Sequence, residues 1–170
     1  MNGISGVAGT RKRALKPTDF TATAHDLASS PRGRPRETNL RRAVSTTYYA
    51  LFHCMAQSGA DLIVGGSGAD RSQPAWRQAY RALDHRLVRQ RCSKQDIISR
   101  FPIEIQDFAD LFVGMQKSRH DADYDPHASF FKSQVLAMIS VTEVAIARFQ
   151  GSPRKDRRAF AVYVLLNLRT

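Results

Sequence analysis

The segment from Lys117 to His127 (KSRHDADYDPH) gathers side chains of this 170-residue chain that could do chemistry. An arginine holds a phosphate group through its planar fork of N–H donors. A neutral histidine moves a proton near physiological pH. These groups are the minimum for metal-free RNA cleavage, in which the 2′-hydroxyl of the substrate is the nucleophile. In this hypothesis Arg119 binds the scissile phosphate, His120 orients it or shares in proton transfer, and His127 is the acid–base group.

The chemistry of His127 depends on the element that carries it. The preceding pair Asp125-Pro126 predicts the start of a helix over 127–150, because Asp is a good N-cap and Pro suits the first helical position. His127 would then lie in the first turn. There the free N–H groups attract phosphate, and the helix dipole lowers the pKa of a histidine.

The same segment has a second interpretation that involves no catalysis. Arg119 and His120 lie in the last turns of a predicted helix, where cations are favourable against the helix dipole. If Arg119 pairs with Asp123 under a packed Tyr124 that bridges two helices, this segment is a structural corner. The position of His127 relative to Arg119 distinguishes the two interpretations.

A long amphipathic helix is predicted to begin near Glu37. Apolar residues recur every three or four positions from Leu40 to Met55, which is the spacing of one buried helix face. This helix carries the pattern Arg42-x-x-Ser-x-x-Tyr48-Tyr49-Ala50-x-Phe52-His53. Taken alone, the pattern is a core stripe, and His53 is interpreted as a structural histidine.

The rest of the chain also favours helices. Further helices are predicted around 18–27, 74–88 and 102–124. The basic and apolar stretch 154–170 favours a terminal helix over a strand, because no partner strand is visible. These elements predict an all-α fold, an up-and-down bundle of four to six helices. The predicted organisation is a disordered basic tail over 1–16, a helical domain over 17–152 and a C-terminal extension over 153–170.

The net charge of +11 is unevenly distributed. Residues 11–42 contain nine Lys or Arg against three acids, and residues 71–100 contain eight against two. Residues 101–127 reverse this, with two bases and six acids. Clustered positive charge around one acidic segment is typical of a surface for a polyanion. We therefore expect RNA as a partner.

Several classes of protein are excluded by what the sequence lacks. There is no H-E-x-x-H or Cys/His ligand spacing, so we expect no metal and no cofactor. No apolar run approaches the roughly 18 residues of a membrane span, and the N-terminal charges are in the wrong order for a signal peptide. Cys54 is expected in the core and Cys92 in a basic surface segment. Two isolated cysteines suit a reducing, cytoplasmic location.

The two patterns together resemble the HEPN superfamily of small helical domains. One is the Tyr48-Tyr49-Ala50-x-Phe52-His53 helix, and the other is Arg119-x-x-Ala122-Asp123-Tyr124 at the end of a later helix. The resemblance spans about residues 36–150. It implies a helical bundle that forms a homodimer and works in a toxin–antitoxin, phage-defence or RNA-processing context.

The resemblance implies three alternative functions. Active members cleave RNA without metal, using an arginine, a following polar residue and a more distal histidine; Arg119 and His120 match the first two, and His127 lies slightly beyond the expected position. Other members are non-catalytic modules that bind RNA or a protein. Others accompany a nucleotidyltransferase, and in some pairs a tyrosine near this motif is modified by the partner, which makes Tyr124 a candidate modification site.

Overall fold

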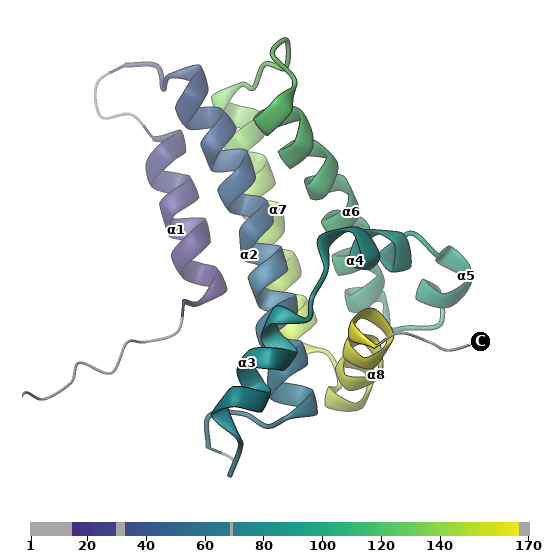
Figure 1. Ribbon diagram of the computed structural model, residues 1–170. Coiled ribbons are helices and arrows are strands. Elements are labelled where there is room, and N and C mark those ends of the chain that lie inside the picture. The colour runs from purple at the N-terminus through teal and green to yellow at the C-terminus, as the bar shows by residue number, and fades with distance from the viewer. Residues whose placement is uncertain (1–14, 30–32, 69, 167–170) are drawn as a thin grey trace, which may run out of the picture.

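Eight helices and no strand make up the part of the chain that the structure describes, so the predicted all-α fold is confirmed. The structure is a computed structural model that describes residues 15–29, 33–68 and 70–166 (Figure 1). The helices are α1 (Pro17–Ala28), α2 (Glu37–Ile63), α3 (Gln73–Arg81), α4 (His85–Cys92), α5 (Gln95–Ile98), α6 (Ile103–Tyr124), α7 (Lys132–Gly151) and α8 (Arg154–Leu165). The predicted basic tail falls mostly outside these ranges, because residues 1–14 are not among those described.

Four helices form an up-and-down core. Helix α1 packs against α2, α2 against α6, α6 against α7, and α7 against α1. Figure 1 shows consecutive members of this ring running in opposite directions. Short connections join α1 to α2 and α6 to α7, so both pairs pack as antiparallel neighbours.

Helix α2 is the centre of the molecule, since it also contacts α3 and α8. Its predicted apolar ladder is confirmed: Leu40, Val44, Tyr48, Leu51 and Met55 are all buried. The helix runs to Ile63, one turn beyond the end expected from Gly59. Gly59 lies close to α8, because a Cβ there would lie 2.6 Å from Leu165 Cδ1 and would require that side chain to shift.

The segment predicted as one helix over 74–88 is two helices, α3 and α4. Asp84 divides them because its side chain accepts a hydrogen bond from the Leu87 N–H at 2.7 Å, which makes Asp84 the N-cap of α4. The connection expected over 93–100 contains the short helix α5. These two differences raise the number of helices above the expected four to six.

The C-terminal segment forms α8, as the sequence favoured, and α8 packs against α2 and α4. Its Phe160 is buried and lies edge-on to Phe149 of α7 at a ring-centroid distance of 6.0 Å. Phe149 in turn stacks on Phe108 of α6 at 4.3 Å. None of the described helices combines the length and the apolar character that crossing a bilayer requires.

Both cysteines are buried, unpaired thiols. Cys54 lies in the core as expected, and burial raises its pKa to about 12. The expectation that Cys92 lies at the surface was wrong, because Cys92, the last residue of α4, is fully buried in the core. Burial raises the Cys92 pKa to about 12 as well.

Candidate functional site

Arg119 is held in an ion pair near the end of α6. Its Nε lies 2.8 Å from Asp123 Oδ2, one helical turn further along. The other oxygen of Asp123, Oδ1, accepts a hydrogen bond from the Ser45 hydroxyl of α2. The Arg119 charge is therefore already compensated, and Asp123 ties the end of α6 to α2.

Two tyrosines flank the Arg119 guanidinium. Its Nη2 donates a long hydrogen bond to the Tyr49 hydroxyl at 3.5 Å, and its Cζ lies 5.8 Å from the ring centres of both Tyr49 and Tyr124. Burial acts to lower the pKa of Arg119, but Tyr49 and Asp123 outweigh that effect and raise it. Arg119 therefore stays charged at any physiological pH.

His120 and Tyr124 project outward from the last turns of α6. Their rings lie 5.1 Å apart, and Tyr124 is 65% exposed. The interpretation of Tyr124 as a packed residue between two helices was wrong. The chain turns away after Tyr124 into a loop and leaves the ring uncovered. The phenol of Tyr124 is consequently accessible from solvent.

His127 does not lie in a helix, so the prediction of a helix over 127–150 was wrong at its start. Helix α7 begins at Lys132, five residues later. The Asp125 carboxylate accepts the His127 N–H at 2.8 Å, which closes a local turn in place of a helix cap. The argument that a helix dipole tunes His127 therefore fails. Among the described residues, no hydrogen bond or ion pair joins this exposed histidine to Arg119.

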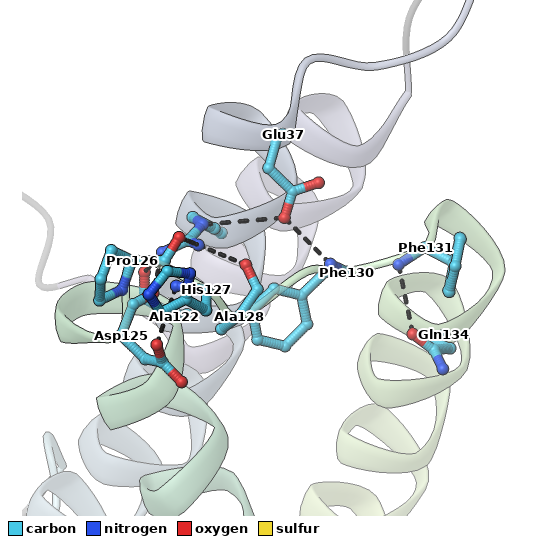
Figure 2. Close-up of polar contacts among 10 residues, drawn as sticks. Glu37, Ala122, Asp125, Pro126, His127, Ala128, Phe130, Phe131 and Gln134 are labelled. Atoms are coloured by element: carbon cyan, nitrogen blue, oxygen red, sulfur yellow. Dashed lines mark hydrogen bonds and ion pairs between the residues drawn. The ribbon is translucent and has the colours of Figure 1, made fainter.

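The loop between α6 and α7 is fastened to the first turns of α2, as Figure 2 shows. Arg41 donates to the carbonyls of Ala122 at 3.2 Å, Asp125 at 2.8 Å, Pro126 at 3.3 Å and, most closely, Ala128. Those carbonyl oxygens accept hydrogen bonds from Arg41, and the regular hydrogen bonding of the α6 helix does not extend into the loop.

Glu37 braces the same loop from the first turn of α2. Its carboxylate accepts the Phe130 N–H at 3.0 Å and lies 3.7 Å from Arg41 Nε (Figure 2). Arg42, which belongs to the sequence pattern, is exposed and takes no part in this network.

The residues of this site share a regular spacing along α2 that was not predicted from the sequence. Every fourth residue of α2 from Glu37 to His53 carries a polar group, and each one contacts another element. We call this set the polar stripe, and it comprises Glu37, Arg41, Ser45, Tyr49 and His53. A polar residue at every fourth position beside the apolar ladder is the signal that could have revealed it.

A second histidine lies near Arg119, and it is His85 rather than His127. The Nδ1 atom of His85, the first residue of α4, is 2.6 Å from the Tyr48 hydroxyl. The His85 carbonyl accepts a hydrogen bond from Gln116 of α6 at 3.0 Å. Burial, and then the positive charge of Arg119, lower the His85 pKa. His85 is therefore a neutral imidazole at pH 7.

His53 is built into the aromatic packing, as the sequence predicted. Its ring stacks on Phe20 of α1 at a centroid distance of 4.5 Å, and its Nδ1 is hydrogen-bonded to the Tyr80 hydroxyl of α3. Burial, followed by the neighbouring His85, lowers its pKa. Tyr80 stacks with His53 at 5.9 Å and with Trp76 at 5.1 Å, and Arg71 Cζ lies 4.8 Å from the centre of the Trp76 ring. Both rings of α3 are therefore stacked within the chain and remain partly exposed.

Helices α3 and α4 also carry a group of exposed arginines. We call them the arginine face: Arg77, Arg81, Arg86 and Arg89. Within the described ranges, the ion pairs involve other residues and leave these four guanidinium groups without a carboxylate partner. Since α4 packs against α6, this basic surface adjoins the helix that carries Arg119.

Comparison with known proteins finds no family model, no curated protein and no solved structure that matches this chain. Within the described residues, no three His, Cys, Asp or Glu side chains come together in a way that could hold a metal ion.

Proposed function

We propose that this chain is a HEPN-like module that binds single-stranded RNA. The observation that carries the proposal is the arginine face, whose four guanidinium groups have no carboxylate partner within the described ranges. Helix α3, which carries Arg77 and Arg81, also carries the partly exposed rings of Trp76 and Tyr80. Arginines bind successive phosphates, and partly exposed aromatic rings contact unpaired bases. Duplex DNA offers no splayed bases to such rings, so single-stranded RNA fits this surface better.

The geometry around Arg119 at the end of α6 fits RNA binding better than it fits RNA cleavage by Arg119, His120 and His127. A substrate phosphate would have to compete with Asp123 for the Arg119 guanidinium, and Asp123 is itself held by Ser45. His127, which was predicted to be the acid–base group, lies in a separate turn. In this proposal Arg119, Asp123 and Ser45 set the angle between α2 and α6.

The test of this proposal is an RNA-binding assay run beside a cleavage assay. We expect the purified chain to retard a short fluorescent single-stranded RNA at low salt, with an affinity that falls steeply as salt is added. In EDTA the same RNA should remain intact. Arg119→Ala should lower the melting temperature while RNA binding by the folded fraction persists. Failure to bind single-stranded RNA at low salt would refute the proposal.

A metal-independent endoribonuclease of a toxin–antitoxin or defence system is the second candidate, and His85 is the observation that favours it. In the tautomer whose Nδ1–H donates to the Tyr48 hydroxyl oxygen, Nε2 of this neutral ring is the basic nitrogen that would accept the proton of a 2′-hydroxyl. The 2′-oxygen would attack phosphorus, the 5′-oxygen would leave and take up a proton from solvent water, and Arg119 would stabilise the phosphorane charge. Cleavage in EDTA that is lost in both His85→Gln and Arg119→Ala, and kept in His127→Ala, would establish this candidate.

We further propose that the chain forms a homodimer through α6 and α7. Val141 and Val144 of α7 are more than half exposed and line a groove of about 280 Å³ with Leu111. The groove is edged by Asp107 and by Arg148, whose ion pair spans 2.7 Å. Charges of both signs on one patch let two copies pair about a twofold axis, because each patch is its own complement.

Val141→Asp is expected to convert this dimer to a monomer without unfolding it, because the side chain is 54% exposed in the single chain. Light scattering after size-exclusion chromatography measures the change in mass. The matched control is Ala147→Asp, an exposed position on the side of α7 that faces α1. A wild-type chain that is monomeric at high concentration would contradict the proposed dimer.

The proposal places the chain in the cytoplasm, where the buried thiols of Cys54 and Cys92 would stay reduced. A nucleotidyltransferase partner, which the HEPN resemblance also implies, would find the phenol of Tyr124 accessible, since that side chain is 65% exposed.

A further inference from the structure

A cavity of about 320 Å³ lies where the C-terminal part of α2 meets the end of α7 and the start of α8. It is separate from the Arg119 corner and from the arginine face, and it plays no part in the function proposed above. Its wall combines Ser58 and Asp61 of α2, Gln150 of α7, and Arg154 and Arg157 of α8. The charge and hydrogen bonding of these groups indicate what the cavity would bind.

The cavity carries uncompensated positive charge. Its one carboxylate, Asp61, is already engaged, since Oδ1 lies 2.9 Å from Arg71 Nη1 and accepts a hydrogen bond from the Trp76 indole at 2.7 Å. Arg154 and Arg157 belong to none of the ion pairs within the described ranges. Two guanidinium groups beside a neutralised carboxylate favour an anion.

One of the two arginines is fixed in place, and a polar atom beside it is unsatisfied. Arg157 Nε donates to the Ser152 carbonyl at 3.1 Å, which holds its guanidinium at the cavity wall. The Ser58 hydroxyl oxygen is buried and has no hydrogen-bond partner among the described residues. A buried hydroxyl without a partner is costly, so an oxygen-rich ligand in the cavity would remove a penalty that the unliganded chain carries.

We propose that this cavity binds a small phosphate monoester, with the phosphate held by Arg154, Arg157 and Ser58. The arginine fork matches two phosphate oxygens at once, and the serine hydroxyl donates to a third. Ligand pockets run from about 300 to 1,000 Å³, so the cavity fits a single sugar phosphate and is too small for a polymer. Gln150 supplies an amide for the hydroxyl groups of the ligand, because its present contact, Nε2 to Cys54 Sγ at 3.8 Å, is weak.

Isothermal titration of the full chain with ribose 5-phosphate, ribose and inorganic phosphate tests the proposal. We expect ribose 5-phosphate to bind, ribose to give no heat of binding, and inorganic phosphate to bind at least tenfold more weakly. Arg154→Gln, at an exposed position, should weaken the binding of ribose 5-phosphate at least tenfold while the melting temperature stays unchanged. Arg157→Gln should weaken the binding of ribose 5-phosphate by more than Arg154→Gln does, and Ser58→Ala should weaken it severalfold.

The matched control is Arg158→Gln, which removes the same charge from an exposed position of α8 outside the cavity wall and should leave binding unchanged. Binding of RNA should be equal in Arg154→Gln and the wild type. The proposed phosphate site and the proposed RNA surface can therefore be refuted independently. Three results would overturn the proposal: no binding of ribose 5-phosphate, binding that Arg154→Gln and Arg157→Gln leave unchanged, or equal affinity for inorganic phosphate. The last result would define a site for free anions.

Discussion

Replacing the four arginines of the arginine face with glutamine is expected to weaken single-stranded RNA binding by about a hundredfold at low salt. Each arginine that contacts a phosphate displaces a condensed counterion, so its removal also flattens the salt dependence. With a slope of about 0.7 per contact for single strands, four lost contacts should reduce the slope of log K against log salt by about 3. Fluorescence anisotropy at several salt concentrations measures both quantities.

The fold should survive this quadruple substitution. All four side chains are exposed, and substitutions at exposed sites change stability by about 0.5 kcal/mol or less. An unchanged melting temperature would therefore assign the loss of affinity to the lost contacts and not to unfolding.

A control variant separates a localised RNA surface from a general effect of net charge. It removes the same number of positive charges from exposed positions on other elements: Arg34, Lys132, Lys155 and Arg158. A diffuse electrostatic attraction would weaken equally in both variants. We expect the control to lose much less affinity, and equal losses would show that α3 and α4 carry no specific RNA surface.

The sequence predicted the elements whose limits are set locally. The apolar ladder from Leu40 to Met55 defines α2, and a proline after Asp125 ends α6 where it was expected. The predicted helix boundaries were wrong where a polar side chain could form either of two local hydrogen bonds. Asp84, which lay inside the helix predicted over 74–88, caps a new helix, whereas Asp125, which was predicted to cap a helix, closes a turn.

The candidate site was predictable only in part, because its partners are distant in the sequence. Arg119 was identified, and its pairing with Asp123 is one of the two arrangements that the spacing allows. Tyr49 and His85 could not be assigned to it, since they lie 70 and 34 positions away and meet it only when α2, α4 and α6 pack. The choice between Arg41 and Arg42 likewise depends on which of the two faces the loop after α6.

Arg41→Ala is expected to lower the free energy of unfolding by about 2–3 kcal/mol. A hydrogen bond from a charged donor contributes about 1.5–3 kcal/mol, and Arg41 makes four, all to carbonyls of the segment 122–128. Its side chain is 20% exposed, so water replaces part of what is lost, and the total stays well below the sum. For a chain of this size the melting temperature should fall by about 5–10 °C.

The neighbouring arginine provides the control for this prediction. Arg42→Ala removes the same charge from the adjacent residue of the same helix, and the Arg42 side chain is exposed, so its stability should change by about 0.5 kcal/mol or less. Arg41→Lys should recover only part of the loss, because one ammonium group cannot reach four carbonyls as a planar guanidinium does. Equal melting temperatures for Arg41→Ala and Arg42→Ala would show that the loop is held by Glu37 and Asp123 alone. Hydrogen exchange at the Ala128 and Phe130 amides should then be unaltered, whereas loss of the Arg41 contacts predicts faster exchange at both.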